Sequence, residues 1–290
     1  PLELKGKAER VPAYRLLSVE EVGTVPRRQL PLVGREAELA TLVGEFDAAV
    51  AAGTCRMVTI VAQAGVGKSR LVEEFFDQIA EGATTLRGRC LPYGRGITFW
   101  PLVEIVRQAA SIVDDDPPEV ARGKIASLHA EQAVLDRVSA AVGLDSRDFP
   151  VPELFWGVRK LFESIAADRP LALRFDDIHW AEATLLDLIA HLRTTIDDVP
   201  LLVLCATRPD LLERRDWTEV SDATIELAPL GEDDATRVIE HVLGTAAVPE
   251  AVRGRIVEAA EGNPLFVEQL VSMCAPIERR DRDTVPEQER

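Results

Sequence analysis

A glycine-containing segment near the start of the chain carries the residue types that hold phosphate. The segment Ala62–Ser69 (AQAGVGKS) follows the β-branched run Met57–Val61 and opens an amphipathic stretch from Lys68 to about Ile79. Glycines let backbone amides approach an anion closely, and a helix N-terminus adds favourable partial charge. The order strand, glycine turn and helix predicts a phosphate-binding loop, or P-loop. Its expected nucleotide contacts come from Ala64, Gly65, Val66, Gly67, Lys68, Ser69 and Arg70.

Two polar residues at the end of this loop have predicted chemical roles. We expect Lys68 to reach the β- and γ-phosphates of a nucleotide and the Ser69 hydroxyl to bind Mg²⁺. The loop departs from the usual pattern at one position, since Ala62 stands where a first glycine is common. A methyl group is a small change there, and Gly65 and Gly67 remain where close approach matters most. A glycine-rich turn that only caps a helix is the alternative interpretation.

An acidic pair ends a second apolar run and is the expected partner of the P-loop. Asp176 and Asp177 close the segment LALRFDD. We expect Asp176 to hold Mg²⁺ through water and Asp177 to position or deprotonate an attacking water. An Asp pair that caps a helix starting near Ala181 is the alternative. Arg174 breaks the apolar pattern of a central strand, and its position suggests the edge of the pocket.

A third strand end, Leu204–Pro209 (LCATRP), offers a contact to a γ-phosphate. Thr207 and Arg208 are both candidates, and Arg208 is preferred because its planar guanidinium suits phosphate oxygens. An arginine solvated in a loop after a strand is the alternative. The predicted catalytic set is Lys68, Asp176, Asp177 and Arg208, with Ser69 and Asp176 as metal ligands.

The elements that must position these residues follow from hydrophobic periodicity. Apolar runs alternate with helical patterns, which predicts a parallel sheet covered on both faces. Strands are expected at Met57–Val61, Thr84–Arg89, Leu171–Phe175, Leu201–Ala206 and Thr224–Leu227. Helical spacing is clear at Arg35–Val50, Lys68 to about Ile79 and Leu185–Leu192, and residues 93–165 alternate helical segments with proline breaks.

After Pro229 the pattern contains helices alone, at Asp233–Leu243, Pro249–Ala260 and Pro264–Met273. We interpret residues 31–228 as an α/β P-loop NTPase core, a three-layer sandwich around a five-stranded parallel sheet. Residues 229–275 are expected to form a small all-helical lid. Residues 1–30 are expected to be a linker with one short strand near Tyr14–Leu17, and residues 276–290 a charged, disordered or truncated tail.

The composition limits the classes of partner. The 290 residues carry a formal charge of −16, and 47% are hydrophobic. An acidic chain repels polyanions, so we expect no direct nucleic-acid binding by this segment. We expect no membrane helix and no secretory signal, and the missing initial Met suggests a piece of a longer protein. The scattered Cys55, Cys90, Cys205 and Cys274 predict buried, reduced thiols and a cytoplasmic location.

Four motifs in chain order resemble those of one family. They are Leu32–Glu38 (LVGREAE), the P-loop, Phe175–Ala181 (FDDIHWA) and Gly262–Phe266 (GNPLF). Together they are similar to the STAND ATPases, signal-transduction ATPases with numerous domains that are related to AAA+ proteins. The resemblance implies ATP or ADP and Mg²⁺ as cofactors, with Val33 and Arg35 near the adenine and Pro264 contacting the base from the lid. A loop that starts a helix and a proline at the first helical position are the alternatives.

The first residues resemble a different family. Leu2–Glu9 and Val11–Arg15 are similar to the final strand region of class III adenylate/guanylate cyclase domains. That resemblance implies a cyclase domain before this segment, as in multidomain bacterial regulators, some of which end in LuxR-type DNA-binding domains or carry helical repeats. An ordinary linker is the alternative, and no cyclase chemistry could reside in so short a remnant.

Three functions compete as interpretations of these residues, and the third, a small-molecule kinase, is rejected. The first is a switch, in which ATP binding closes the lid on the core and slow hydrolysis resets it, signalling to other domains. The second is an AAA+ motor that assembles with ATP, with Arg214 or Arg215 as the arginine supplied to a neighbour. A domain that binds nucleotide and barely hydrolyses it is a variant of the first. A small-molecule kinase fits poorly, because Arg87, Arg89 and Arg95 precede the acidic strand.

Overall fold

The computed structural model describes residues 31–92, 98–214, 217, 219–243 and 249–274. The chain divides into two units, Pro1–Pro31 and Leu32–Arg290. The cyclase-like residues, the strand near Tyr14–Leu17, the tail 276–290, Arg95 and Arg215 lie outside the described residues.

Five parallel strands form one sheet in the described part of the chain. They are β1 (Cys55–Ala62), β2 (Thr84–Arg89), β3 (Leu171–Asp176), β4 (Leu201–Thr207) and β5 (Ala223–Leu227), in the spatial order β2-β3-β4-β1-β5. All five agree with the sequence prediction to within two residues at each end. Because β4 lies between β1 and β3 in a parallel sheet, the three predicted polar segments meet at one carboxyl edge of the sheet.

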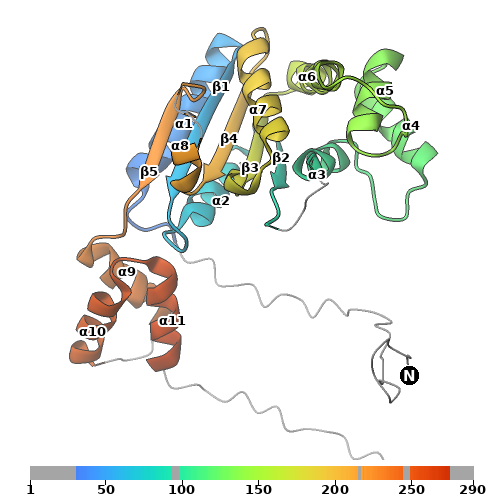
Figure 1. The fold of residues 1–290 in the computed structure, drawn as a ribbon. Coiled ribbons are helices and arrows are strands. Elements are labelled where there is room, and N and C mark those ends of the chain that lie inside the picture. The colour runs from blue at the N-terminus through green and yellow to red at the C-terminus, as the bar shows by residue number, and fades with distance from the viewer. Residues whose placement is uncertain (1–30, 93–97, 215–216, 218, 244–248, 275–290) are drawn as a thin grey trace, which may run out of the picture. The chain divides into compact units, whose positions relative to one another are not determined.

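Helices cover both faces of the sheet, as the predicted three layers require (Figure 1). On one face, α1 (Glu36–Ala52) and α2 (Lys68–Ile79) pack against Val58, Ile60 and Leu204. On the other, α6 (Val151–Asp168) and α7 (Ala183–Thr195) pack against Met57, Val203 and Cys205. The alternation of strand residues between the two clusters is the period of two that a pleated strand imposes.

Shorter helices complete the core. They are α3 (Trp100–Ala109), α4 (Pro118–Leu128), α5 (Gln132–Ala141), the 3-10 turn η1 (Ile178–Trp180) and α8 (Asp210–Arg214). The first of these, α3, lies against the edge strand β2, where a Cβ on Gly88 would stand 2.2 Å from the carbonyl oxygen of Pro101. Glycine at this position therefore permits the close approach of helix and strand.

Three helices follow the sheet, α9 (Glu232–Leu243), α10 (Glu250–Ala260) and α11 (Pro264–Cys274). Their buried residues form a hydrophobic cluster that contains one residue from before α1, Val33. We call these three helices the lid; whether they form a separate domain with a boundary at 228/229 stays a prediction.

The cysteine prediction is wrong at one position. All four cysteines are free, and Cys55, Cys90 and Cys205 are buried, but Cys274 at the end of α11 is exposed. It ends the last described turn of a helix whose buried side chains are Val267 and Val271. Among the described helices, none has the length and apolarity to cross a bilayer.

Candidate nucleotide-binding site

The P-loop has the backbone geometry that an anion cradle requires. Gly65 and Gly67 have φ values of 84° and 99°, in the left-handed region that favours glycine. The loop leads directly into α2 at Lys68, and the first turn of α2 contains no acidic residue. The helix N-terminus therefore presents its amides to an incoming phosphate without a competing carboxylate on that turn.

The alanine at the first position of the loop lies in the sheet. Ala62 is the last residue of β1, pairs with Leu227 of β5 and is 2% exposed. Its φ is not positive, so no glycine is required there. The departure from the usual pattern thus leaves the phosphate cradle itself unaltered.

Asp177 connects the acidic segment to the P-loop. Its carboxylate lies 3.4 Å from Lys68 Nζ and 3.0 Å from Arg89 Nε at the end of β2. Burial alone would raise the pKa of Asp177, but the charges of Lys68 and Arg89 outweigh it and hold this pKa below its ordinary value. Asp177 is therefore a carboxylate, available to accept a hydrogen bond or a proton.

The side chain of Asp177 does not cap a helix. Asp177 has φ 55° and stands at the N-cap of η1, yet makes no side-chain capping bond. The next helix, α7, starts at Ala183, with Glu182 rather than either aspartate at its N-cap. The capping alternative for the Asp pair is thus wrong in this structure.

Asp176 has a cation of its own. Arg174, two residues earlier on β3, places Nε 2.7 Å from Asp176 Oδ2, at an angle outside that of a hydrogen bond. The Arg174 side chain is buried, with 8% of its surface exposed. From the sequence, we expected Arg174 to lie at the edge of the pocket. The structure places it inside the sheet, against Asp176, the predicted metal ligand.

The end of β4 holds the two γ-phosphate candidates in different surroundings. Thr207 is fully buried and its hydroxyl donates to the carbonyl oxygen of Arg208 at 3.1 Å. Arg208 is exposed, on the strand end between the P-loop strand and the acidic strand. Ser69, the second predicted metal ligand, is also exposed, in the first turn of α2.

His179 was missed as a site residue. It follows the Asp pair by two positions, is 3% exposed, and neither ring nitrogen has a hydrogen-bond partner among the described residues. Burial holds the pKa of His179 below its ordinary value; the Asp177 carboxylate opposes this effect and Arg208 adds to it. A buried imidazole that interacts with the charges of Asp177 and Arg208 is a candidate site residue. Its place in the FDDIHWA motif is the signal that could have found it.

The lid contacts the P-loop directly. Asn263 Nδ2 donates to the carbonyl oxygen of Ala64 at 3.1 Å, and the amide of Leu265 donates to that of Gly65 at 3.3 Å. A Cβ on Gly65 would lie 2.6 Å from Asn263 Oδ1, so the amide fits closely over the glycine. The same oxygen accepts the amides of Leu265 and Phe266 and so caps α11.

The residues expected near the adenine lie at the same junction. Arg35 is 6% exposed and its guanidinium donates to the carbonyl oxygens of Val66 and Ala228, at 3.4 and 2.5 Å. Val33 is buried among the lid helices. Pro264 Cγ is 3.9 Å from the position of a Cβ on Gly67. Arg70 pairs with Glu74 at 2.6 Å along α2.

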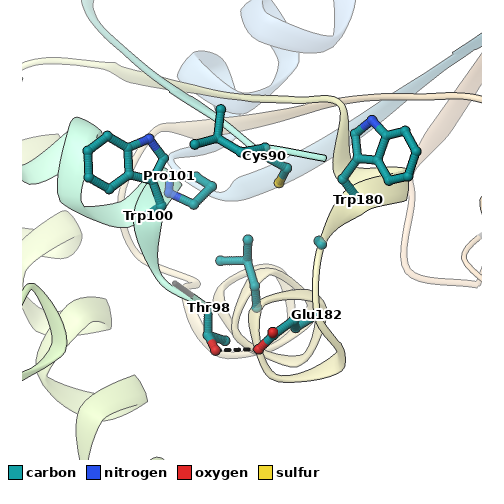
Figure 2. A pocket seen from close by; sticks show the side chains of 9 residues that line it. Cys90, Thr98, Trp100, Pro101, Trp180 and Glu182 are labelled. Atoms are coloured by element: carbon teal, nitrogen blue, oxygen red, sulfur yellow. Dashed lines mark hydrogen bonds between the residues drawn. The ribbon is translucent and has the colours of Figure 1, made fainter. Parts of the chain in front are cut away.

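A small hollow lies beside the acidic segment. Trp100 and Trp180 stand on opposite sides of it, and Thr98 and Glu182 are joined by a hydrogen bond at its far end (Figure 2). Trp180 follows His179 in η1, and the two rings lie 5.0 Å apart. Cys90 lines the hollow, and burial, with the nearby Asp177 and Asp176 charges, raises its pKa to about 12. The thiol is therefore protonated and unreactive near neutral pH.

The comparisons with known proteins agree with this geometry. The model of the AAA ATPase domain matches residues 31–204, more than half of the chain. An uncharacterized protein of Rhizobium meliloti (strain 1021), R02095, is 28% identical over 92% of this chain. The chain spans 28% of that relative's length.

Two solved structures are similar to this chain, and the first of them shows the shared fold. The Orc1 protein of Aeropyrum pernix, solved in complex with DNA, is similar over 84% of this chain and 60% of its own, with a TM-score of 0.51 and 12% identity. The Cdc6p protein of Pyrobaculum aerophilum is similar over 87% and 63%, with a TM-score of 0.49 and 12% identity. The fold and the phosphate cradle define a nucleotide-binding P-loop protein. The chain belongs to the AAA ATPase domain family.

Proposed function

We propose that this chain is an Mg-ATP-binding switch of the STAND type, which changes the docking of its lid on ATP binding and slow hydrolysis. The observation that supports it is the pair of hydrogen bonds from Asn263 and Leu265 to the P-loop carbonyls. Any rearrangement of the loop around phosphates acts on the lid through these bonds. The binding energy of the triphosphate can thus shift the lid between two positions, which other domains of a longer protein would read.

The predicted roles fit the surroundings of each residue. On nucleotide binding, Lys68 would leave its ion pair with Asp177 and contact the β- and γ-phosphates. Asp177 would then be free to orient an attacking water. Ser69 and Asp176 would hold Mg²⁺, which commonly takes one or two protein oxygens together with phosphate oxygens and water. When bound, the metal would neutralise charge that develops on the phosphates. Arg208 would contact the γ-phosphate from β4.

A motor assembled in a ring is the second candidate, and one contact weighs against it. Arg214, a candidate for donation to a neighbour, donates through Nη2 to the carbonyl oxygen of His179 in its own chain at 2.7 Å. To serve another subunit it would have to release this bond. The cyclase domain before the segment and the domains after it remain proposals from the resemblance, and the cytoplasmic location remains a proposal from the cysteine pattern.

The test is a titration of the purified chain with ATP and ADP, with and without Mg²⁺, followed by a phosphate-release assay and size measurement. We expect ATP and ADP to bind, slow phosphate release and a monomer in every state. Absence of nucleotide binding contradicts the proposal, and an ATP-driven hexamer favours the motor.

A further inference from the structure

Arg174 is a buried cation in the middle of a strand. In register it pairs with Arg87 of β2 and Leu204 of β4. Its side chain keeps 8% of its surface exposed, so most of its hydration is lost. An arginine keeps its proton at any accessible pH, so it cannot relieve this cost by becoming neutral. A nearby anion must compensate, and Asp176 is that anion.

The compensating anion is also the predicted metal ligand. The 2.7 Å approach of Arg174 Nε to Asp176 Oδ2 places a positive charge against a carboxylate that is itself only 19% exposed. A divalent cation that approaches Asp176 must share this oxygen with the guanidinium or displace it. It also meets the repulsion of a fixed positive charge in surroundings of low dielectric constant.

We propose that Arg174 is a built-in competitor of Mg²⁺ at Asp176. The metal enters this site weakly, and nucleotide binds through Lys68 and the loop amides with little dependence on Mg²⁺. Arg174 thereby sets the metal requirement of the switch. This inference rests on the proposed ATP-binding function and adds a regulatory property to the same site.

The alternative is that Arg174 orients Asp176 for the metal. The two roles predict opposite changes when the charge is removed and the length of the side chain is kept, as in Arg174→Met. Loss of a competitor strengthens metal binding, whereas loss of an orienting partner weakens it. Arg174→Lys keeps the charge and serves as the control.

The experiment measures the affinity of Mn²⁺ for the ADP complex of the parent, Arg174→Met and Arg174→Lys by electron paramagnetic resonance. We expect Mn²⁺ to bind Arg174→Met about ten-fold more tightly than the parent, since one nearby charge is removed. Arg174→Lys should stay within about three-fold of the parent. An unchanged or weaker Mn²⁺ affinity in Arg174→Met overturns the proposal.

Two further measurements keep the result interpretable. If Arg174→Met does not fold, Asp176→Asn is compared with the parent: a carboxylate already neutralised by Arg174 contributes little, so Mn²⁺ affinity should fall less than about three-fold. A larger fall overturns the proposal.

Binding of ADP and ATP to the parent chain in EDTA tests the proposed nucleotide-binding function separately. A parent that binds no nucleotide under any condition refutes the proposed function. A parent that binds nucleotide only with Mg²⁺ refutes the competition between Arg174 and Mg²⁺ and leaves the proposed function standing.

Discussion

The side-chain amide of Asn263 joins two elements that are 199 positions apart in the chain, donating to the carbonyl oxygen of Ala64 at 3.1 Å. The donor belongs to the lid and the acceptor to the P-loop. Because Asn263 Oδ1 also caps α11, one side chain determines both how this helix begins and how it meets the loop.

The two roles of Asn263 can be separated by substitution. Asn263→Asp keeps a capping oxygen but has no donor for Ala64, so the free energy of unfolding should fall by about 0.5–1.5 kcal/mol. Asn263→Ala also loses the cap and should be less stable by about 1 kcal/mol more. Both should bind ATP about 2-fold to 10-fold more weakly, the worth of one neutral hydrogen bond. Calorimetric titration and urea unfolding measure the two effects, and an ATP affinity equal to that of the parent would refute the coupling.

Gly65→Ala tests the close fit of Asn263 over the loop. The new methyl would stand 2.6 Å from Asn263 Oδ1, at a φ of 84°. The backbone alone costs about 1–2 kcal/mol for a non-glycine residue, and the clash moves the lid amide. Gly143→Ala, at a φ of 76° with nothing within 4 Å, is the matched control, and it should destabilise the chain by the backbone cost alone, about 1–2 kcal/mol. Equal effects of the two substitutions in thermal unfolding would show that the lid does not fit against Gly65.

Substitutions at Lys68 and at Asp177 should have separate effects on ATP binding and on ATP hydrolysis. Lys68→Ala removes the phosphate contact and should abolish measurable ATP binding, whereas Lys160→Ala on α6 should leave it unchanged. Asp177→Asn should retain ATP binding and lower phosphate release by about 10²-fold or more, the usual contribution of a general base. Asp115→Asn, in an exposed loop, controls for the change of charge. Tight ATP binding by Lys68→Ala would show that the phosphate assignment is wrong.

His179 should make stability depend on pH. Since its pKa is lowered in the folded chain, the unfolded chain binds more protons below the ordinary histidine pKa of about 6.5, so stability falls on acidification through that range. His179→Leu removes two unpartnered nitrogens and should raise the free energy of unfolding by about 1 kcal/mol at pH 7.5, and by more at pH 5.5. It should also slow ATP turnover, because the imidazole interacts with the charges of Asp177 and Arg208.

His191 is the comparison for this experiment, because burial also lowers its pKa and it lies on α7 away from the Asp pair. His191→Leu should reduce the same acid sensitivity without slowing turnover. Loss of stability in His179→Leu, measured by urea unfolding at both pH values, would contradict the account of His179.

The sequence predicts the sheet and the P-loop well because both follow from local patterns. Apolar runs bounded by turn residues locate β1 to β5, and α2 begins at Lys68 as its motif requires. The position of Ala62 in β1 could not be read from the motif, which does not say where the strand ends.

Features that depend on how the chain packs could not be predicted from the sequence patterns. The pairing of Arg174 with Asp176 depends on which way a strand residue faces and on burial that only packing produces. The Asn263–Ala64 bond depends on how the lid lies against the loop. A single histidine in a motif has many possible surroundings, and only the structure shows that His179 is buried without a partner.

Hydrogen–deuterium exchange tests the coupling of loop and lid most directly. The parent and Asn263→Asp are compared without nucleotide, with ADP and with ATP, following the peptides of Ala64–Ser69 and Pro264–Cys274. If Asn263 couples the loop to the lid, ATP changes the exchange of both segments in the parent. In Asn263→Asp, ATP changes the exchange of the loop segment alone. An ATP-dependent change confined to the loop in the parent would contradict this coupling.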